Sequence, residues 1–107
     1  MITLFWTPQA QDDLAAIHAY ISQSSVPFAD LTVRELIKSV RRLADFPESG
    51  RVAPEPRRAD VREVIWRSYR LVYRHLPDRR EVHVLTVFRS ERPFPSLAGL
   101  PPETGAG

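Results

Sequence analysis

The sequence contains no cysteine, only one lysine and no long apolar run. Without cysteine, neither a disulfide framework nor a thiolate metal site can form. This excludes the class of small secreted domains that disulfides stabilise. No apolar stretch approaches the roughly 20 residues that a membrane-spanning helix needs. The N-terminal segment also lacks the basic lead and apolar core of a secretory signal. We therefore expect a cytoplasmic protein with no membrane segment.

The length of 107 residues predicts a single domain with one modest core, since 43% of the residues are hydrophobic. We place this domain at residues 1–95. Residues 96–107 are rich in proline, glycine and small side chains, so we predict a disordered tail. The three histidines lack the short spacing of a metal site. We predict neither a metal nor a cofactor.

The net charge is only +2, but the charges are unevenly distributed. Residues 1–50 carry four basic and six acidic side chains, whereas residues 51–95 carry eleven arginines and six acids. Arginine makes planar, multi-donor contacts with carboxylates and phosphates that lysine cannot match. A GC-rich genome explains the preference for arginine equally well, but it does not explain the clustering. The second half is therefore predicted to bind a large charged partner.

Local patterns predict one strand and two helices in the first half. Residues 2–6 are β-branched and aromatic, as in a strand. Thr7 then reads as a helix N-cap before proline, and apolar residues at helical spacing extend the helix over residues 8–22. A second apolar stripe follows the turn at residues 23–27, and Pro47 ends it. Two helices joined by so short a turn should pack antiparallel.

The second half predicts a three-stranded meander, with strands near residues 60–66, 69–74 and 81–89. The predicted fold class is therefore α+β in the order β-α-α-β-β-β, a helical hairpin packed on a small, mainly antiparallel sheet. Residues 47–60 contain three prolines and a glycine. A connection of this length is often functional. The alternative is an ordered crossover from helix to sheet.

Alternation along residues 69–74 assigns side chains to the two faces of the sheet. Tyr69, Leu71 and Tyr73 should pack on the helices. Arg70 and Arg74 should lie on the opposite face and meet carboxylates of a partner. We accordingly expect Leu71→Ala to destabilise the fold by roughly 2–5 kcal/mol, and Arg70→Ala to leave it mostly intact.

Five short segments follow one another in a distinctive order, namely WTPQA (6–10), DLAAIHAYI (13–21), LADFPESGR (43–51), VREV (61–64) and YRLVYR (69–74). Together they resemble the RelE/ParE superfamily of toxins from bacterial type II toxin–antitoxin systems. The resemblance covers roughly residues 2–95 and implies the fold predicted above.

The superfamily has two branches with different chemistry. RelE-like members cut messenger RNA in the ribosomal A site, whereas ParE-like members poison DNA gyrase. RNA cleavage requires charge stabilisation at the phosphate and groups that move protons. RelE-like toxins supply these from basic residues before the Tyr-Arg motif, from the arginine of that motif, from a second arginine after the last strand and from a late tyrosine.

This chain keeps the motif arginine, Arg70, but departs from the RelE-like pattern elsewhere. Glu63 lies on the preceding strand, where its carboxylate would repel a phosphate. Arg89 and Arg92 flank the second arginine position without matching it, and no tyrosine follows Tyr73. The ParE-like branch is favoured, with no catalytic residue. On a RelE-like interpretation, Arg70, Arg89 and Arg92 would be catalytic.

The resemblance implies a toxin that inhibits DNA gyrase or topoisomerase IV and is neutralised by a ParD-like antitoxin. Two alternatives remain, a RelE-like ribosome-dependent messenger RNA endonuclease and an inert relative that only binds an antitoxin. The candidate residues for binding target or antitoxin are arginines of the second half, namely Arg62, Arg70, Arg74, Arg89 and Arg92.

Direct nucleic-acid binding is a further possibility that the charges disfavour. Trp66 and Tyr69 bracket a turn and could stack on bases. However, Glu55, Asp60 and Glu63 interleave with the arginines, and a net charge of +2 is small for a protein that binds phosphates. We do not expect direct binding to nucleic acid.

Overall fold

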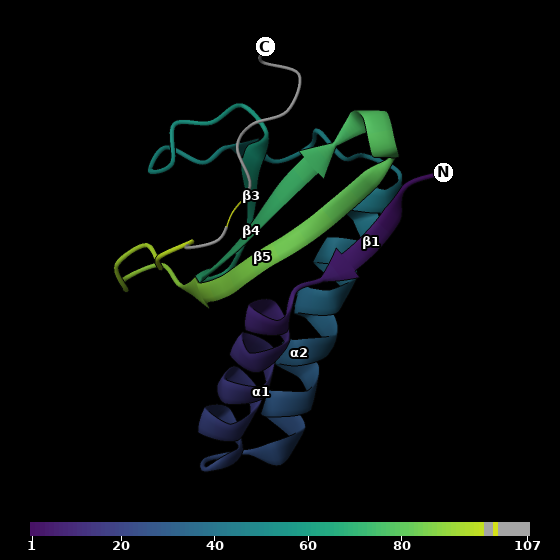
Figure 1. Cartoon of the computed structure of the whole chain (residues 1–107). Helices are drawn as coiled ribbons and strands as arrows, with labels where there is room; N and C mark the ends of the chain where they lie inside the picture. Colours follow the sequence, from purple (N-terminus) through teal and green to yellow (C-terminus); the bar gives the residue numbers. More distant parts are fainter. Residues whose placement is uncertain (98–99, 101–107) are drawn as a thin grey trace.

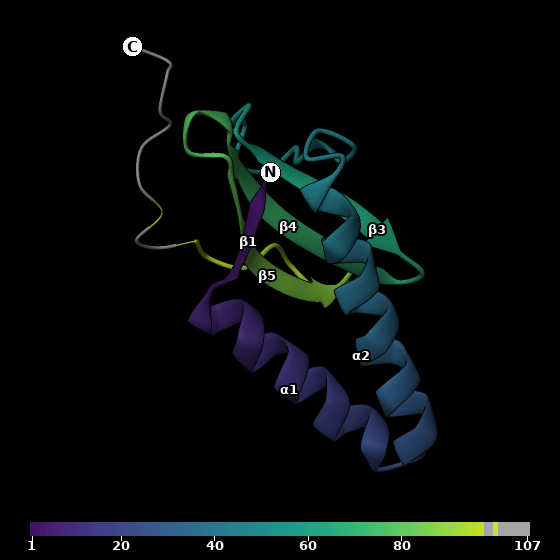
Figure 2. The same ribbon diagram turned by 90° about the vertical axis from the view of Figure 1, so that its right-hand side faces the viewer.

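The computed structural model describes residues 1–97 and residue 100, which form two helices packed on one face of a five-stranded sheet (Figures 1 and 2). None of the described helices is long and apolar enough to cross a membrane. The elements in chain order are β1 (Thr3–Trp6), α1 (Pro8–Ser22), α2 (Val26–Arg41), the 3-10 turn η1 (Arg42–Ala44), β2 (Arg51–Val52), β3 (Val61–Trp66), β4 (Tyr69–Leu76), the 3-10 turn η2 (Pro77–Arg79) and β5 (Glu81–Arg89).

Both helices start at a side-chain cap followed by proline. Thr7 Oγ1 accepts from the backbone N–H of Ala10 and also donates to the carbonyl of Val84, 2.8 Å away. Ser25 caps α2 in the same way, and Pro27 lies in its first turn. These caps satisfy N–H groups that a helix start leaves without a partner. The predicted bounds of α1 are confirmed.

The sheet has the strand order β1-β5-β4-β3-β2, in which only the β1–β5 pair is parallel. The predicted α+β class is confirmed, with one strand added. That strand, β2, has two residues and pairs Arg51 with Glu63 and Val52 with Arg62. Residues 47–60 therefore form an ordered crossover, the second of the two interpretations above.

Apolar side chains cover both faces of the sheet. On the helix face, Leu36 and Leu71 lie in one buried cluster, and α1 is tied to β5 by Asp13, which accepts from Thr86 Oγ1 at 2.6 Å. Tyr69, Leu71 and Tyr73 lie in the buried clusters of this face, as predicted. The opposite face, called here the far face, has a smaller core of Ala53, Val61, Val72, Leu85 and Phe88.

The segment after β5 lies against the far face. Phe94, Leu97 and Leu100 are partly buried against its core. The rest of the predicted disordered tail, at residues 98–99 and 101–107, lies outside the described residues. The domain boundary at residue 95 stays a prediction.

Candidate functional site

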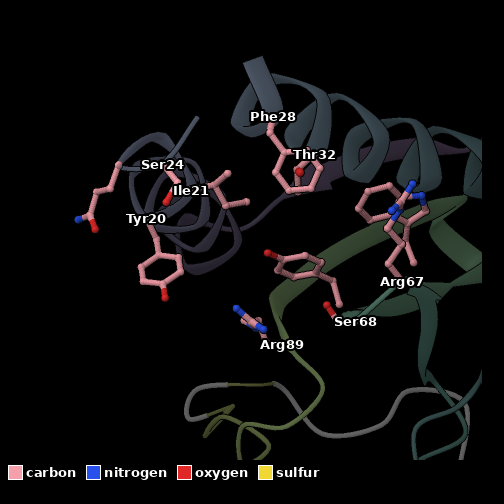
Figure 3. Close-up of a pocket in the computed structure, with 11 residues that line it drawn as sticks. Tyr20, Ile21, Ser24, Phe28, Thr32, Arg67, Ser68 and Arg89 are labelled. Carbon is pink, nitrogen blue, oxygen red and sulfur yellow. The ribbon is translucent and has the colours of Figure 1, made fainter. Parts of the chain in front are cut away.

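A cleft of about 620 Å³ opens between the helical hairpin and the turn that joins β3 to β4 (Figure 3). We call it the hairpin cleft. The helices contribute one wall and the sheet the other. Its lining consists of Tyr20, Ile21, Gln23, Ser24, Phe28 and Thr32 from the hairpin, and Trp66, Arg67, Ser68, Tyr69 and Arg89 from the sheet.

The sheet wall is aromatic with a cationic rim. The rings of Trp66 and Tyr69 stack with centroids 6.4 Å apart, and the Arg67 guanidinium lies 5.0 Å from the Trp66 ring centroid. Arg67 has a φ of 52°, which allows the tight turn between the two strands. The backbone N–H of Ser90 holds this turn by donating to the carbonyl of Ser68 at 2.7 Å. This bond joins the turn to the segment that follows β5.

The hairpin wall exposes large apolar side chains. Tyr20 and Phe28 are 64% and 48% exposed, and Val26 and Leu31 nearby are also exposed. Figures 1 and 2 show why, because the hairpin extends beyond the sheet and its distal turn has no second layer over it. Exposed apolar groups gathered at a cleft are typical of a protein-binding surface.

The far face holds a cluster of charges that we call the Arg70 network, formed by Arg51, Glu55, Glu63 and Arg70. Glu63 is buried and accepts from Arg51 Nε at 2.5 Å and from Arg70 Nε at 2.7 Å, with a further bond from Arg70 Nη2. Arg70 Nη1 and Nη2 each donate to one oxygen of Glu55 at 2.7 Å. The network contains two cations and two anions.

These contacts shift the pKa values of Arg70 and Glu55 in opposite directions. The hydrogen bonds that Arg70 donates to Glu55 raise the pKa of Arg70 despite its burial. The bond from Arg70 lowers the pKa of Glu55 below its ordinary value. Both groups are therefore charged at neutral pH.

A second ion cluster ties the crossover to β4. The Asp60 carboxylate accepts from Arg74 Nε and from Arg58 Nη2, both at 2.7 Å. Burial raises the pKa of Asp60, but the bonds from Arg58 and Arg74 outweigh it and lower the pKa overall. The crossover is thus held by Glu55 and Asp60 together.

The structure gives Arg70, Arg74 and Glu63 partners within this chain, and the binding of target or antitoxin by the two arginines stays a prediction. Arg70 and Arg74 do lie opposite the helices, but they are 9% and 4% exposed and their carboxylates come from this chain instead of a partner. Glu63 faces no substrate, because it is a buried counter-ion. Arg70→Ala would leave Glu63 with Arg51 alone, so we now expect this variant to fold with lower stability. Sequence alternation identified the face correctly but not its internal pairing.

Of the remaining candidate arginines, Arg62 lies apart, whereas Arg89 and Arg92 line one pocket. Arg62 Nη1 donates to the carbonyl of Gly50 at 2.8 Å, at the edge where β2 begins. Arg89 lines the hairpin cleft, and its Nε lies 2.6 Å from Glu91 Oε1. Arg92 is exposed beyond the end of β5. The structure does not bring the five candidates together, and only Arg89 reaches the cleft.

Sequence analysis missed the hairpin side of the cleft. Tyr20 and Phe28 lie outside the apolar stripes that pack on the sheet, close to the turn between the helices. The presence of large apolar residues outside the apolar stripes of the two helices could have indicated this surface. Among the described residues, no three His, Asp or Glu side chains are placed to hold a metal ion.

Residues 4–94 match the family of ParE toxins of type II toxin–antitoxin systems, parDE. The chain belongs to this family. The predicted superfamily and branch are confirmed. A search of curated proteins finds no match.

Solved structures show the same fold. The chromosomal ParDE system of P. aeruginosa matches with a TM-score of 0.70 and 24% identity, over 85% of this chain and 98% of that one. The isolated RelE toxin of E. coli matches with a TM-score of 0.63 and 20% identity, over 87% and 88%. The RelBE2 complex of Mycobacterium tuberculosis matches with a TM-score of 0.53 and 23% identity, over 82% of this chain and 90% of that one. The toxin thus has the RelE/ParE fold.

Proposed function

We propose that this toxin inhibits DNA gyrase or topoisomerase IV and cuts no RNA itself. The observation that carries the proposal is the state of Arg70. A guanidinium has five N–H donors, and Arg70 makes four hydrogen bonds to Glu55 and Glu63. An arginine bound in this way is not available to a scissile phosphate. Action through protein contact needs no such group.

One further part of a nuclease site is missing from the sequence. No tyrosine follows Tyr73, so the late tyrosine of RelE-like toxins has no counterpart. The similarity to the RelE toxin of E. coli is a likeness of fold at 20% identity. It therefore does not favour the RelE-like alternative over membership of the ParE family.

We propose further that a ParD-like antitoxin neutralises the toxin by binding in the hairpin cleft. The similar structures include a ParDE system and a toxin–antitoxin complex. An amphipathic segment that folds on binding needs an apolar groove with charged edges. Tyr20, Phe28 and Trp66 offer the groove, and Arg67 and Arg89 offer the edges. Acidic residues beside apolar anchors are the expected chemistry of the antitoxin segment.

The candidate arginines take different roles under this proposal. Arg62, Arg89 and Arg92 are proposed to contact target or antitoxin directly, since none of them belongs to the Arg70 network. Arg70 and Arg74 are proposed to act indirectly, by holding the crossover in place. Because both proposed targets are cytoplasmic, the protein is proposed to act there.

A supercoiling assay with purified toxin tests the target. We expect loss of gyrase or topoisomerase IV activity, or accumulation of cleaved DNA, and reversal by the antitoxin. No effect of saturating toxin on either enzyme from the same host would contradict the proposal. A parallel translation reaction should leave ribosome-bound messenger RNA intact, and cleavage there would favour the RelE-like alternative.

Inducing the toxin gene in the host distinguishes an active toxin from the third alternative, an inert relative that only binds an antitoxin. A toxin stops growth when produced without its antitoxin. Unchanged growth, together with retained antitoxin binding, would identify an inert relative. A short neighbouring gene that encodes a DNA-binding end and a charged amphipathic end would supply the antitoxin for these experiments.

A further inference from the structure

We propose that the outer face of α2 is the surface that binds the toxin's enzyme target, through carboxylates that flank an apolar side chain of that enzyme. The inference rests on the proposed function, since the partner is the gyrase or topoisomerase IV that the toxin is proposed to inhibit. It adds the place of contact, which lies apart from the hairpin cleft.

Three basic side chains define the outer face, namely Arg34, Lys38 and Arg41. All three are exposed, whereas Leu36 and Val40 of the same helix are buried in the core against the sheet. The three basic residues follow the helical period and lie on the side of α2 opposite these buried residues. Arg34 and Arg41 are two turns apart, about 10 Å along the helix axis. Two guanidinium groups are thus presented to solvent on one face of the helix.

The two arginines of the outer face have no partner within the part of the chain that the structure describes. Neither forms an ion pair or a side-chain hydrogen bond there. Lys38 lies 3.8 Å from Glu35, and its side chain is 67% exposed. Arg70 and Arg74 on the far face are, in contrast, bound to carboxylates of this chain. Carboxylates of a partner can therefore pair with the arginines of α2 without breaking an ion pair inside the toxin.

A hollow of about 390 Å³ is lined by both of these arginines. Val33 and Ile37 contribute apolar lining, and His18 and Asp30 complete it. His18 Nε2 donates to Asp30 Oδ1 at 2.7 Å, so the carboxylate of the hollow already has a partner. The described lining shares no residue with that of the hairpin cleft. An apolar side chain held in such a hollow and flanked by charged pairs is typical of a protein interface.

The charges of α2 favour a protein over nucleic acid as the partner. Asp30 and Glu35 lie among the three cations in the sequence of α2, so a row of phosphates along the helix would meet two carboxylates. Contacts to a nucleic-acid backbone also make no use of an apolar hollow. A protein surface can place carboxylates on the arginines and an apolar side chain between them.

Charge reversal on the outer face, Arg34→Glu with Arg41→Glu, tests the inference. The control is Arg79→Glu with Arg80→Glu, which makes the same change in charge at two exposed residues that line neither the hollow nor the hairpin cleft. Assays of gyrase and topoisomerase IV give the toxin concentration for half inhibition, and calorimetry gives the affinity for the antitoxin. We expect the outer-face variant to need roughly tenfold more toxin or beyond for half inhibition, with unchanged affinity for the antitoxin. The control should match the unaltered toxin in both measurements.

Equal inhibition by the outer-face variant and the control would overturn the inference. If charge reversal also weakens antitoxin binding, Arg34→Gln with Arg41→Gln repeats the comparison with the charges removed and the helix undisturbed. Loss of both inhibition and antitoxin binding in that variant would refute a separate surface for the target. Failure of the unaltered toxin to inhibit either enzyme would instead refute the proposed function, and this inference would fall with it.

The fluorescence anisotropy of a labelled DNA duplex distinguishes nucleic acid from protein as the partner of the outer face. We expect the outer-face variant and the control to show the same duplex binding, because their net charges are equal. Duplex binding by the unaltered toxin that the outer-face variant alone loses would assign this face to DNA and overturn the inference.

Discussion

Gly50 lies where the structure leaves no space for a side chain, so adding a methyl group there should lower the stability of the fold. A Cβ there would lie 2.5 Å from the Glu63 carbonyl oxygen and 2.7 Å from Tyr73 Oη. Tyr73 cannot withdraw freely, because its hydroxyl donates to the carbonyl of Pro47 at 2.8 Å and accepts from the N–H of Gly50. The crossover is thus packed against the sheet backbone with no room for a side chain.

We expect Gly50→Ala to lower the free energy of unfolding by about 1–3 kcal/mol, the usual cost of overpacking. Urea unfolding measures this loss. Ser49→Ala is the control, since Ser49 is exposed and should change stability by no more than about 0.5 kcal/mol. A Gly50→Ala variant as stable as the control would show that the crossover can move enough to accept the added methyl group.

Arg70 and Leu71 should both matter for stability, but for different reasons. Leu71 is 1% exposed in the helix-face core, so Leu71→Ala should cost roughly 2–5 kcal/mol. Arg70→Ala removes one partner of a buried ion pair, a change that typically costs about 3–5 kcal/mol. Since Arg51 stays bound to Glu63, we expect the loss near the lower end of that range or below it.

A double variant separates the two causes. Arg70→Ala is expected to destabilise the fold because it leaves the buried Glu63 charge without its Arg70 partner. In that case, Arg70→Ala combined with Glu63→Gln should lower the free energy of unfolding by less than the sum of the two single losses. Leu71→Ala with Glu63→Gln is the control and should be closer to additive. Additive losses in the first pair would contradict a buried charge network.

The crossover should make the fold sensitive to acid. The pKa values of Glu55 and Asp60 are lowered in the folded protein, so the folded state binds fewer protons than the unfolded state at acidic pH. Their stabilising effect is fully present above the unfolded pKa values and is lost as pH falls through the folded ones. We expect the free energy of unfolding to decrease as the pH drops below about 4.

Asp60→Asn tests the source of that dependence. The variant should be less stable than the unaltered protein at pH 7, and its stability should change less between neutral and acidic pH. Urea unfolding across this range measures both effects. An unchanged slope with pH would assign the acid sensitivity to other carboxylates.

The helical hairpin should carry the antitoxin contacts on the side that faces the cleft. We expect Phe28→Ala to weaken antitoxin binding roughly tenfold or more, as for a central aromatic anchor. Leu31→Ala is the matched control, because Leu31 is 40% exposed on the same helix but does not line the cleft. Calorimetry gives both affinities. Equal losses would place the antitoxin elsewhere on the hairpin.

How far the sequence predicted each element depended on how local its signals were. The bounds of α1 followed from Thr7, Pro8 and an apolar period, all of which act within a few residues. The strand β2 has two exposed residues and no alternation, so its pairing with β3 left no pattern to read. The partners of Arg70 were equally hidden, since Glu55 lies 15 residues away and meets it only through the path of the crossover.

The assembled fold changes the meaning of the arginine-rich half. Its charge excess suggested a surface of free guanidinium groups, but many of them are bound within the chain. In the part of the chain that the structure describes, the arginines of residues 51–95 in ion pairs are Arg51, Arg58, Arg70, Arg74 and Arg89. Fewer guanidinium groups are therefore left for partners than the composition implied.

The most direct test of a toxin that acts through protein contact is to induce it in host cells and map protein-linked DNA breaks and transcript ends in the same samples. The account predicts that DNA breaks accumulate at gyrase or topoisomerase IV sites while messenger RNA stays intact. Transcripts cut at ribosomal codons, with the chromosome unbroken, would contradict it.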